Sequence, residues 1–303
     1  MSFEKRRWLR TAFQLKGSVV LSVLPRSLFC GFFGLVVTLL FNYRLPVSLP
    51  FLASLIPNIV LGLLLVFRTN TAYDRFWEGR KLWGKMVNSV RNLARQIWVV
   101  VREDCPSDRE EKIRALHLLV AFASTTKSHL RQDPLDRQLK ELISPEQFTM
   151  LQSLNHPPLR VAFWIGDYLQ RQYQRNRIGI HQLTEMHMLL DSLVDAMGGC
   201  ERILKTPMPM AYAIHLKQLL LLYCLSLPFQ MVENLVWWTA PVVVLISFTL
   251  FGIEEIGIEI ENPFGCDTND LPLDAICETM KRNIDDLITL EPGVCWTETT
   301  IER

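Results

Sequence analysis

The stretch LPVSLPFLASLIPNIVLGLLLVF, residues 45–67, contains no charged side chain and runs directly into RTNTAYDRFWEGRKLWG, residues 68–84. A helix rises 1.5 Å per residue, so about 20 apolar residues cross the roughly 30 Å hydrocarbon core of a bilayer. The first stretch is therefore long enough to span a membrane. The second, in which charges and aromatic rings alternate at helical spacing, belongs in water. The sequence predicts a membrane span that continues into a water-exposed helix.

The overall composition indicates a membrane protein. Of the 303 residues, 49% are hydrophobic and 21% are charged, with a mean hydropathy of +0.16, so apolar and charged residues are segregated along the chain. The 32 basic and 31 acidic residues give a net charge of only +1, which argues against a nucleic-acid partner. The seven cysteines form no CxxC pair, so neither a disulfide framework nor a zinc ribbon is expected.

Four apolar segments are predicted to cross the lipid bilayer, at residues 27–41, 45–67, 209–232 and 235–253. Lys and Arg gather before the first segment and after the second, and there are none between residues 232 and 235. The positive-inside rule then places both termini in the cytoplasm. No cleavable signal peptide is expected, because Arg26 interrupts the first apolar stretch and no small-residue cleavage site follows it.

The segments 68–208 and 254–303 are predicted to form cytosolic helices. Apolar residues between Phe76 and Ile97 recur in steps of three, four or seven, which indicates an amphipathic helix. Ser144, Pro145 and Gln147 have the pattern of an N-cap, a first helical residue and a capping box. The remaining predicted helices cover residues 110–129, 160–175, 181–197 and 273–286. No strand pattern of useful length occurs, so the expected fold is all-α, with four transmembrane helices and a helical cytosolic bundle in one continuous unit over residues 1–303.

Three signatures follow one another along the chain. The first consists of Phe67, Arg68, Asn70, Tyr73, Arg75, Trp77, Glu78, Arg80 and Trp83. The second is GGCERI at residues 198–203, and the third is ENPFG at 261–265, which continues to NDLPLD at 269–274. In this order they resemble the signatures of the bestrophin family, and in particular of its bacterial branch. The resemblance covers most of the chain. It implies a homopentameric ion channel of the bacterial inner membrane, with a central pore that passes small monovalent ions passively.

Within the second span, Ile59, Leu63 and Phe67 follow each other at i, i+4 and i+8 and so lie along one stripe of a helix. The helix is apolar on every side, so periodicity alone does not distinguish this trio from others. In the family, this register lines the neck of the pore, where five copies would form three apolar rings that gate by dewetting.

The sequence leaves open which kind of ion passes the neck. The resemblance implies a chloride or other anion channel, but the two upper neck positions are aliphatic, whereas animal members are richer in aromatics there. A channel selective for monovalent cations is therefore the first alternative. A membrane scaffold that conducts no ions is the second.

The resemblance also implies an apolar constriction at the cytosolic exit, just before the helix that leads to GGCERI. Counting back from this signature gives Ile180, with Ile178 nearly as good, and packing of Ile180 inside the helical bundle is the alternative. Arg68, at the membrane boundary, either attracts anions towards a vestibule or anchors the end of the span. Asn70 flanks the neck on the same side.

The acidic segment after ENPFG suggests calcium. Animal bestrophins carry a dense acidic run there that helps to bind calcium, and this chain keeps Asp267 and Asp270 of it. Two carboxylates with backbone carbonyls would form a weak calcium site, whereas a capped turn before the next helix is the favoured alternative. No other cofactor is expected. An enzyme is not expected either, because His181, Glu185 and His187 do not form HExxH and no GxSxG or phosphate-binding glycine loop occurs.

Overall fold

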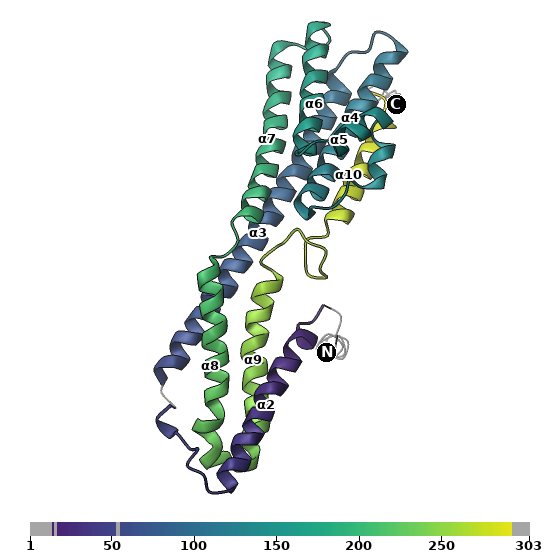
Figure 1. Ribbon diagram of the computed structural model, residues 1–303. Helices are drawn as coiled ribbons and strands as arrows, with labels where there is room; N and C mark the ends of the chain where they lie inside the picture. Colours follow the sequence, from purple (N-terminus) through teal and green to yellow (C-terminus); the bar gives the residue numbers. More distant parts are fainter. Residues whose placement is uncertain (1–13, 15–16, 53–54, 293–303) are drawn as a thin grey trace, which may run out of the picture. The chain divides into compact units, whose positions relative to one another are not determined.

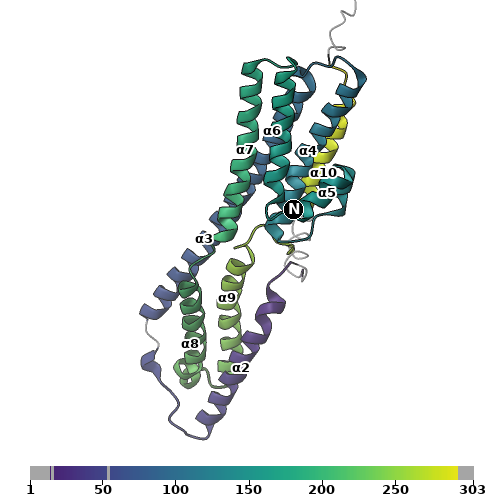
Figure 2. The same cartoon turned by 45° about the horizontal axis from the view of Figure 1, so that its top comes forward.

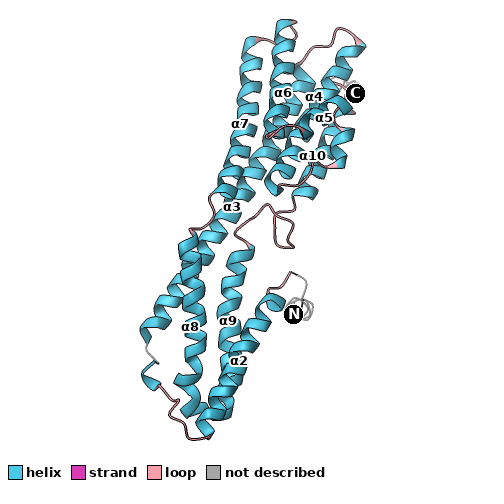
Figure 3. Ribbon diagram, viewed as in Figure 1, coloured by secondary structure: helices cyan, strands magenta, loops and turns pink. Residues whose placement is uncertain are grey.

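The computed structural model describes residue 14 and residues 17–52 and 55–292. Its regular elements are helices, and no strand occurs in these ranges (Figure 3). The chain forms two compact units. The first unit comprises residues 1–77, 206–263 and 267–270, and the second comprises residues 78–205, 264–266 and 271–303. The division concerns the contacts within a single chain. It does not test the prediction that residues 1–303 act together as one channel unit, which stays a prediction.

In its described residues, the first unit contains three α-helices and the beginning of a fourth. They are α2 (Val20–Asn42), α8 (Met210–Leu235), α9 (Thr239–Glu259) and the first part of α3 (Leu55–Val100), with the short 3-10 helices η1 (Pro50–Leu52) and η3 (Val236–Trp238). Helix α2 packs along α9, and α8 packs against both (Figures 1 and 2). Val20–Asn42 and the region Met210–Glu259 are long and apolar enough to cross a membrane.

A glycine sets the close packing of α2 on α9. A Cβ atom added to Gly31 would lie 2.1 Å from Cγ2 of Val244, far inside van der Waals contact. Small residues at such positions let two membrane helices approach closely without a hydrophobic driving force between them.

Gly31→Ala is therefore expected to destabilise the protein by about 1–3 kcal/mol, the usual cost of overpacking. The measurement is thermal unfolding of detergent-purified protein. Val244→Ala in the same chain should restore most of the lost stability, because it removes the methyl group that the new Cβ meets. Gly252→Ala is the control, since no atom lies within 4 Å of a Cβ built there. Equal destabilisation by both glycine variants would contradict the packing argument.

The helix of the second predicted span begins at Leu55, so the prediction of a membrane helix from Leu45 was wrong at its start. Residues 45–49 form an irregular connection to η1. Pro46 and Pro50 explain the difference, because proline lacks an amide hydrogen and disfavours the α conformation in the residue before it. From Leu55 to Phe67 the helix rises only about 20 Å, less than the roughly 30 Å hydrocarbon core.

The other three segments predicted as spans are helical, with different boundaries. Helix α2 starts at Val20, seven residues before the predicted 27–41 span. Helix α8 agrees closely with 209–232 but continues to Leu235. The fourth, predicted at 235–253, begins only at Thr239 because η3 precedes it, and it continues to Glu259. Apart from Arg26 on α2, the basic residues near the N-terminus that supported the topology lie outside the described residues.

The second unit is a helical bundle around α4 (Pro106–Arg131), in which every residue from Leu118 to Ser128 is buried. Helices α6 (Pro157–Gln174) and α10 (Leu273–Ile288) lie on either side of α4 (Figures 1 and 2). Helix α7 (Ile180–Lys205) packs on α6. The end of α3, η2 (Arg137–Glu141) and α5 (Pro145–Gln152) complete the unit.

The predicted helices of the second unit are confirmed, although α7 continues eight residues beyond Met197 through the GGCERI signature. The capping box is also confirmed. The amide of Gln147 donates to Oγ of Ser144 at 3.2 Å, and the amide of Ser144 donates to Oε1 of Gln147 at 3.0 Å. Pro145 is the first helical residue.

Candidate pore-lining helix and its anchor

The three predicted neck residues form an exposed apolar stripe on α3. Ile59 and Leu63 are each 52% exposed and Phe67 is 62% exposed in the single chain. A contiguous stripe of exposed large apolar side chains marks a surface that contacts lipid or another protein. The stripe is thus available to face a shared axis if several copies assemble.

The opposite side of the same helix is buried. Leu61, Leu65, Arg68 and Ala72 are each at most 5% exposed. At about 100° per residue, these four positions cluster on one face, and the neck stripe lies roughly 180° away from them. Leu61 and Leu65 join the core with α8 and α9, so packing inside the protomer fixes which face of α3 is presented outward.

Arg68 marks the point where this helix is tied to the rest of the first unit. Its side chain is only 4% exposed, and its Nη2 donates to Oε2 of Glu261 at 2.7 Å. The other carboxylate oxygen of Glu261 accepts the amide of Met208 at 2.9 Å. Arg75, two turns further along α3, donates to the carbonyls of Glu261 and Thr206. We call Arg68, Arg75 and Glu261 the arginine–glutamate anchor.

The anchor keeps Glu261 ionised. Burial alone raises the pKa of Glu261, but the hydrogen bond from the Met208 amide and the guanidinium of Arg68 outweigh it, and the net pKa lies below the ordinary value. The pairing of Arg68 with Glu261 supports a role for Arg68 in anchoring the end of the span, and its role stays a prediction. Asn70 is exposed on the same side of α3 as the neck stripe, and its place beside a neck stays a prediction.

The two isoleucines proposed for the cytosolic constriction differ in exposure. Ile180 is the first residue of α7 and is 52% exposed, so it is free to face another chain. Ile178 is only 5% exposed and packs within its own bundle, so Ile180 is the better placed of the two to face a shared pore. The constriction itself stays a prediction.

The acidic segment forms a closed turn. The amide of Asp267 donates to Oδ2 of Asp270 at 2.8 Å, and the amide of Asp270 donates back to the carbonyl of Asp267 at 3.1 Å. This is the capped turn that was the alternative to a calcium site. Among the described residues, neither aspartate belongs to a group of three side chains placed to hold a metal ion. Calcium binding here stays a prediction.

Asp274, a few residues further on, is an ion-pair centre of the second unit that the sequence did not reveal. It accepts from Nζ of Lys127 at 2.7 Å and from Nη1 of Arg131 at 2.8 Å. Lys127 is buried on α4 and also contacts Asp136 at 2.8 Å. Arg131 donates in addition to the carbonyls of Phe264 and Gly265, which belong to ENPFG. This cluster ties the third signature to α4.

These contacts predict how stability depends on pH. The hydrogen bond from Lys127 holds the pKa of Asp274 below its ordinary 3.8. Burial raises the pKa of Asp136, but Lys127 outweighs it and the net shift is also downward. A lowered carboxyl pKa stabilises the fold above pH 3.8, and this stability is lost as the pH falls through the lower, folded-state pKa. The melting temperature of purified protein is therefore expected to fall steeply below about pH 4.

Lys127→Met should flatten that fall, because both carboxyl pKa values return towards the ordinary one. Lys281→Met is the matched control, since it removes a lysine from an exposed pair with Glu141. The measurement is the melting temperature between pH 5 and 2. A slope that Lys127→Met leaves unchanged would show that these pairs do not control acid stability.

Comparison with known proteins identifies the relatives of this chain. The family model of bacterial and fungal bestrophins matches residues 1–286. A voltage-dependent anion channel-forming protein from a Nostoc species is 64% identical, covering 97% of this chain and 96% of the relative. A protein of the same description from Escherichia coli is 32% identical, covering 92% and 91%.

A solved structure gives the same result for the fold. The crystal structure of a variant of a bacterial bestrophin homolog from Klebsiella pneumoniae superposes with a TM-score of 0.81 at 30% identity, covering 88% of this chain and 99% of that one. The fold is therefore bestrophin-like, and the sequence match extends over nearly the whole of both chains. Together, these matches show that the chain belongs to the bestrophin family of bacteria and fungi.

Proposed function

We propose that this protein is a passive anion channel in which α3 lines the pore and Ile59, Leu63 and Phe67 form the neck. The observation that carries the proposal is the exposed apolar stripe on the side of α3 opposite its buried face. An apolar ring of this kind gates by dewetting and conducts when it hydrates or widens. The relatives from Nostoc, Synechocystis and Escherichia coli, named as voltage-dependent anion channel-forming proteins, support the anion assignment.

The assembly that we propose is a homopentamer in the bacterial inner membrane, with both termini in the cytoplasm. Four spans would place the two ends of the chain on the same side of the membrane. Ile180, which is exposed in the single chain, would form the second constriction, at the cytosolic exit of the pore. Native mass spectrometry of the detergent-solubilised protein tests the subunit number. Five copies are expected, and a monomer would leave the neck stripe without a shared axis. No enzymatic activity is part of this proposal.

Selectivity is tested by the reversal potential in planar bilayers under a KCl gradient. A value near the chloride equilibrium potential is expected, and replacing chloride by a bulky anion should abolish most of the current. A value near the potassium equilibrium potential would instead support the monovalent-cation channel, with the aliphatic side chains of Ile59 and Leu63 as the cause. Folded, oligomeric protein that carries no current would support the non-conducting scaffold.

A further inference from the structure

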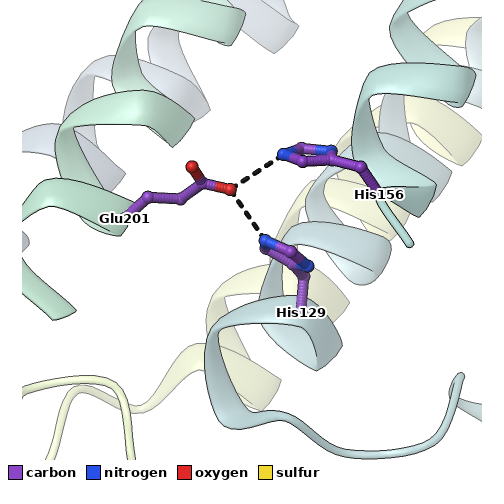
Figure 4. A group of neighbouring side chains, drawn as sticks. All are labelled: His129, His156 and Glu201. Atoms are coloured by element: carbon purple, nitrogen blue, oxygen red, sulfur yellow. Dashed lines mark hydrogen bonds and ion pairs between the residues drawn. The ribbon is translucent and has the colours of Figure 1, made fainter. Parts of the chain in front are cut away.

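Two histidines and a glutamate from three separate elements meet in the second unit. His129 lies near the end of α4, His156 immediately precedes α6, and Glu201 lies on α7. The Nε2 atoms of His129 and His156 lie 2.7 Å and 2.8 Å from the same oxygen, Oε1 of Glu201 (Figure 4). The two rings are tilted against each other with centroids 4.6 Å apart. The three potential ligand atoms all lie within 4.8 Å of one another.

We propose that His129, His156 and Glu201 form a binding site for a divalent transition-metal ion, with zinc as its best-fitting occupant. Two imidazoles and one carboxylate are a ligand set that zinc accepts, and water completes the tetrahedron. At ligand distances of about 2.0–2.2 Å, tetrahedral ligand atoms lie roughly 3.4 Å apart. Each Nε2 atom, now 2.7 Å or 2.8 Å from Oε1 of Glu201, therefore needs to move away from that oxygen by less than about 1 Å. Calcium and magnesium prefer sites made of oxygen ligands alone, so two imidazoles argue against them.

The surroundings allow an ion to enter and favour its charge. The side chains are 22%, 33% and 17% exposed for His129, His156 and Glu201. His129 also lines a cavity of about 610 Å³ that is open to solvent, together with Pro157 and Lys205. Oε1 of Glu201 lies between the two imidazole rings, so its carboxylate supplies negative charge where a cation would bind.

Hydrogen bonding within the cluster competes with the ion. Nδ1 of His156 accepts the amide of Leu159 at 3.2 Å and so caps α6, which places the ring proton on Nε2. A metal ion takes the position of that Nε2 proton, and a neutral imidazole then carries its proton on Nδ1. Binding at His156 therefore exchanges the cap for a metal bond. Oε2 of Glu201 contacts Lys205 at 3.2 Å, and this contact needs no change.

The test is zinc titration of metal-stripped, full-length protein in detergent, against a chelating dye of known affinity. One zinc ion per chain is expected. His129→Gln and His156→Asn should each weaken binding by at least about tenfold, the scale reached even by changes around a metal site. Asparagine is a good N-cap, so His156→Asn removes the Nε2 ligand while it retains a cap for α6. Cobalt should give the visible absorption of a tetrahedral site in the native chain only.

His181→Gln is the matched control, because His181 is exposed on α7 and lies outside the cluster. It should leave the affinity unchanged. Elution volume and helical content verify that every variant is folded. Zinc bound with equal affinity by the native chain and both cluster variants would overturn the proposal, and so would an absence of zinc binding at 100 µM. Neither result bears on conduction, so this test is independent of the proposed channel function.

Discussion

Replacing Ile59, Leu63 and Phe67 together by alanine is expected to raise the current through reconstituted protein substantially. In the proposed neck, three rings of large apolar side chains would exclude water, and an ion that crosses would lose part of its hydration. Alanine would widen this neck and let water in. If the rings contribute about 1.4 kcal/mol to the barrier, the current rises about tenfold. The same change should reduce discrimination between anions, since the narrow aperture no longer selects by size.

The measurement is single-channel conductance in planar bilayers, with a matched triple variant beside it. Phe32, Leu222 and Leu245 are 65%, 68% and 66% exposed and lie on α2, α8 and α9. Their replacement by alanine removes a comparable exposed apolar surface away from α3 and should leave the conductance unchanged. Native-like conductance in a folded neck variant would remove these three residues from the pore. Equal increases in both triple variants would indicate a general loosening of the fold.

Much of the helical architecture could be predicted from local patterns. The apolar segments gave the helices of the first unit, and Ser144, Pro145 and Gln147 correctly marked the start of α5. These features depend on neighbours within a few residues, which a sequence displays directly. The start of α3 was placed too early because an uncharged, apolar run of residues has the same composition in a loop as in a helix. The prolines at 46 and 50 carried the relevant signal.

The contacts between distant segments could not be predicted. Arg68 and Glu261 are separated by 193 positions, and neither residue type nor spacing pairs them. The resemblance placed one in the first signature and the other in the third, without showing that they touch. His129, His156 and Glu201 were missed for the same reason, whereas the sequence drew attention to His181 and Glu185 on one helix. Side chains from three elements are brought together only by the packing of α4, α6 and α7.

Glu261→Ala is expected to be among the most destabilising single substitutions in the first unit. It removes the carboxylate that pairs with Arg68 and leaves a guanidinium in a site that is only 4% exposed. It also deprives the amide of Met208 of its acceptor. Removing one partner of a buried ion pair typically costs about 3–5 kcal/mol, because the remaining charge has lost its solvent and its partner together. The melting temperature of detergent-purified protein should fall by many degrees.

Arg202→Ala is the matched control for this substitution. Arg202 pairs with Glu78 at the same 2.7 Å, but the two side chains are 67% and 43% exposed. An exposed ion pair contributes about 0–1 kcal/mol, so its loss should hardly change the melting temperature. Arg68→Met should cost less than Glu261→Ala, because a buried methionine leaves no charge behind. Equal effects of Glu261→Ala and Arg202→Ala would mean that α3 is held by its apolar contacts alone, and that the arginine–glutamate anchor contributes orientation without stability.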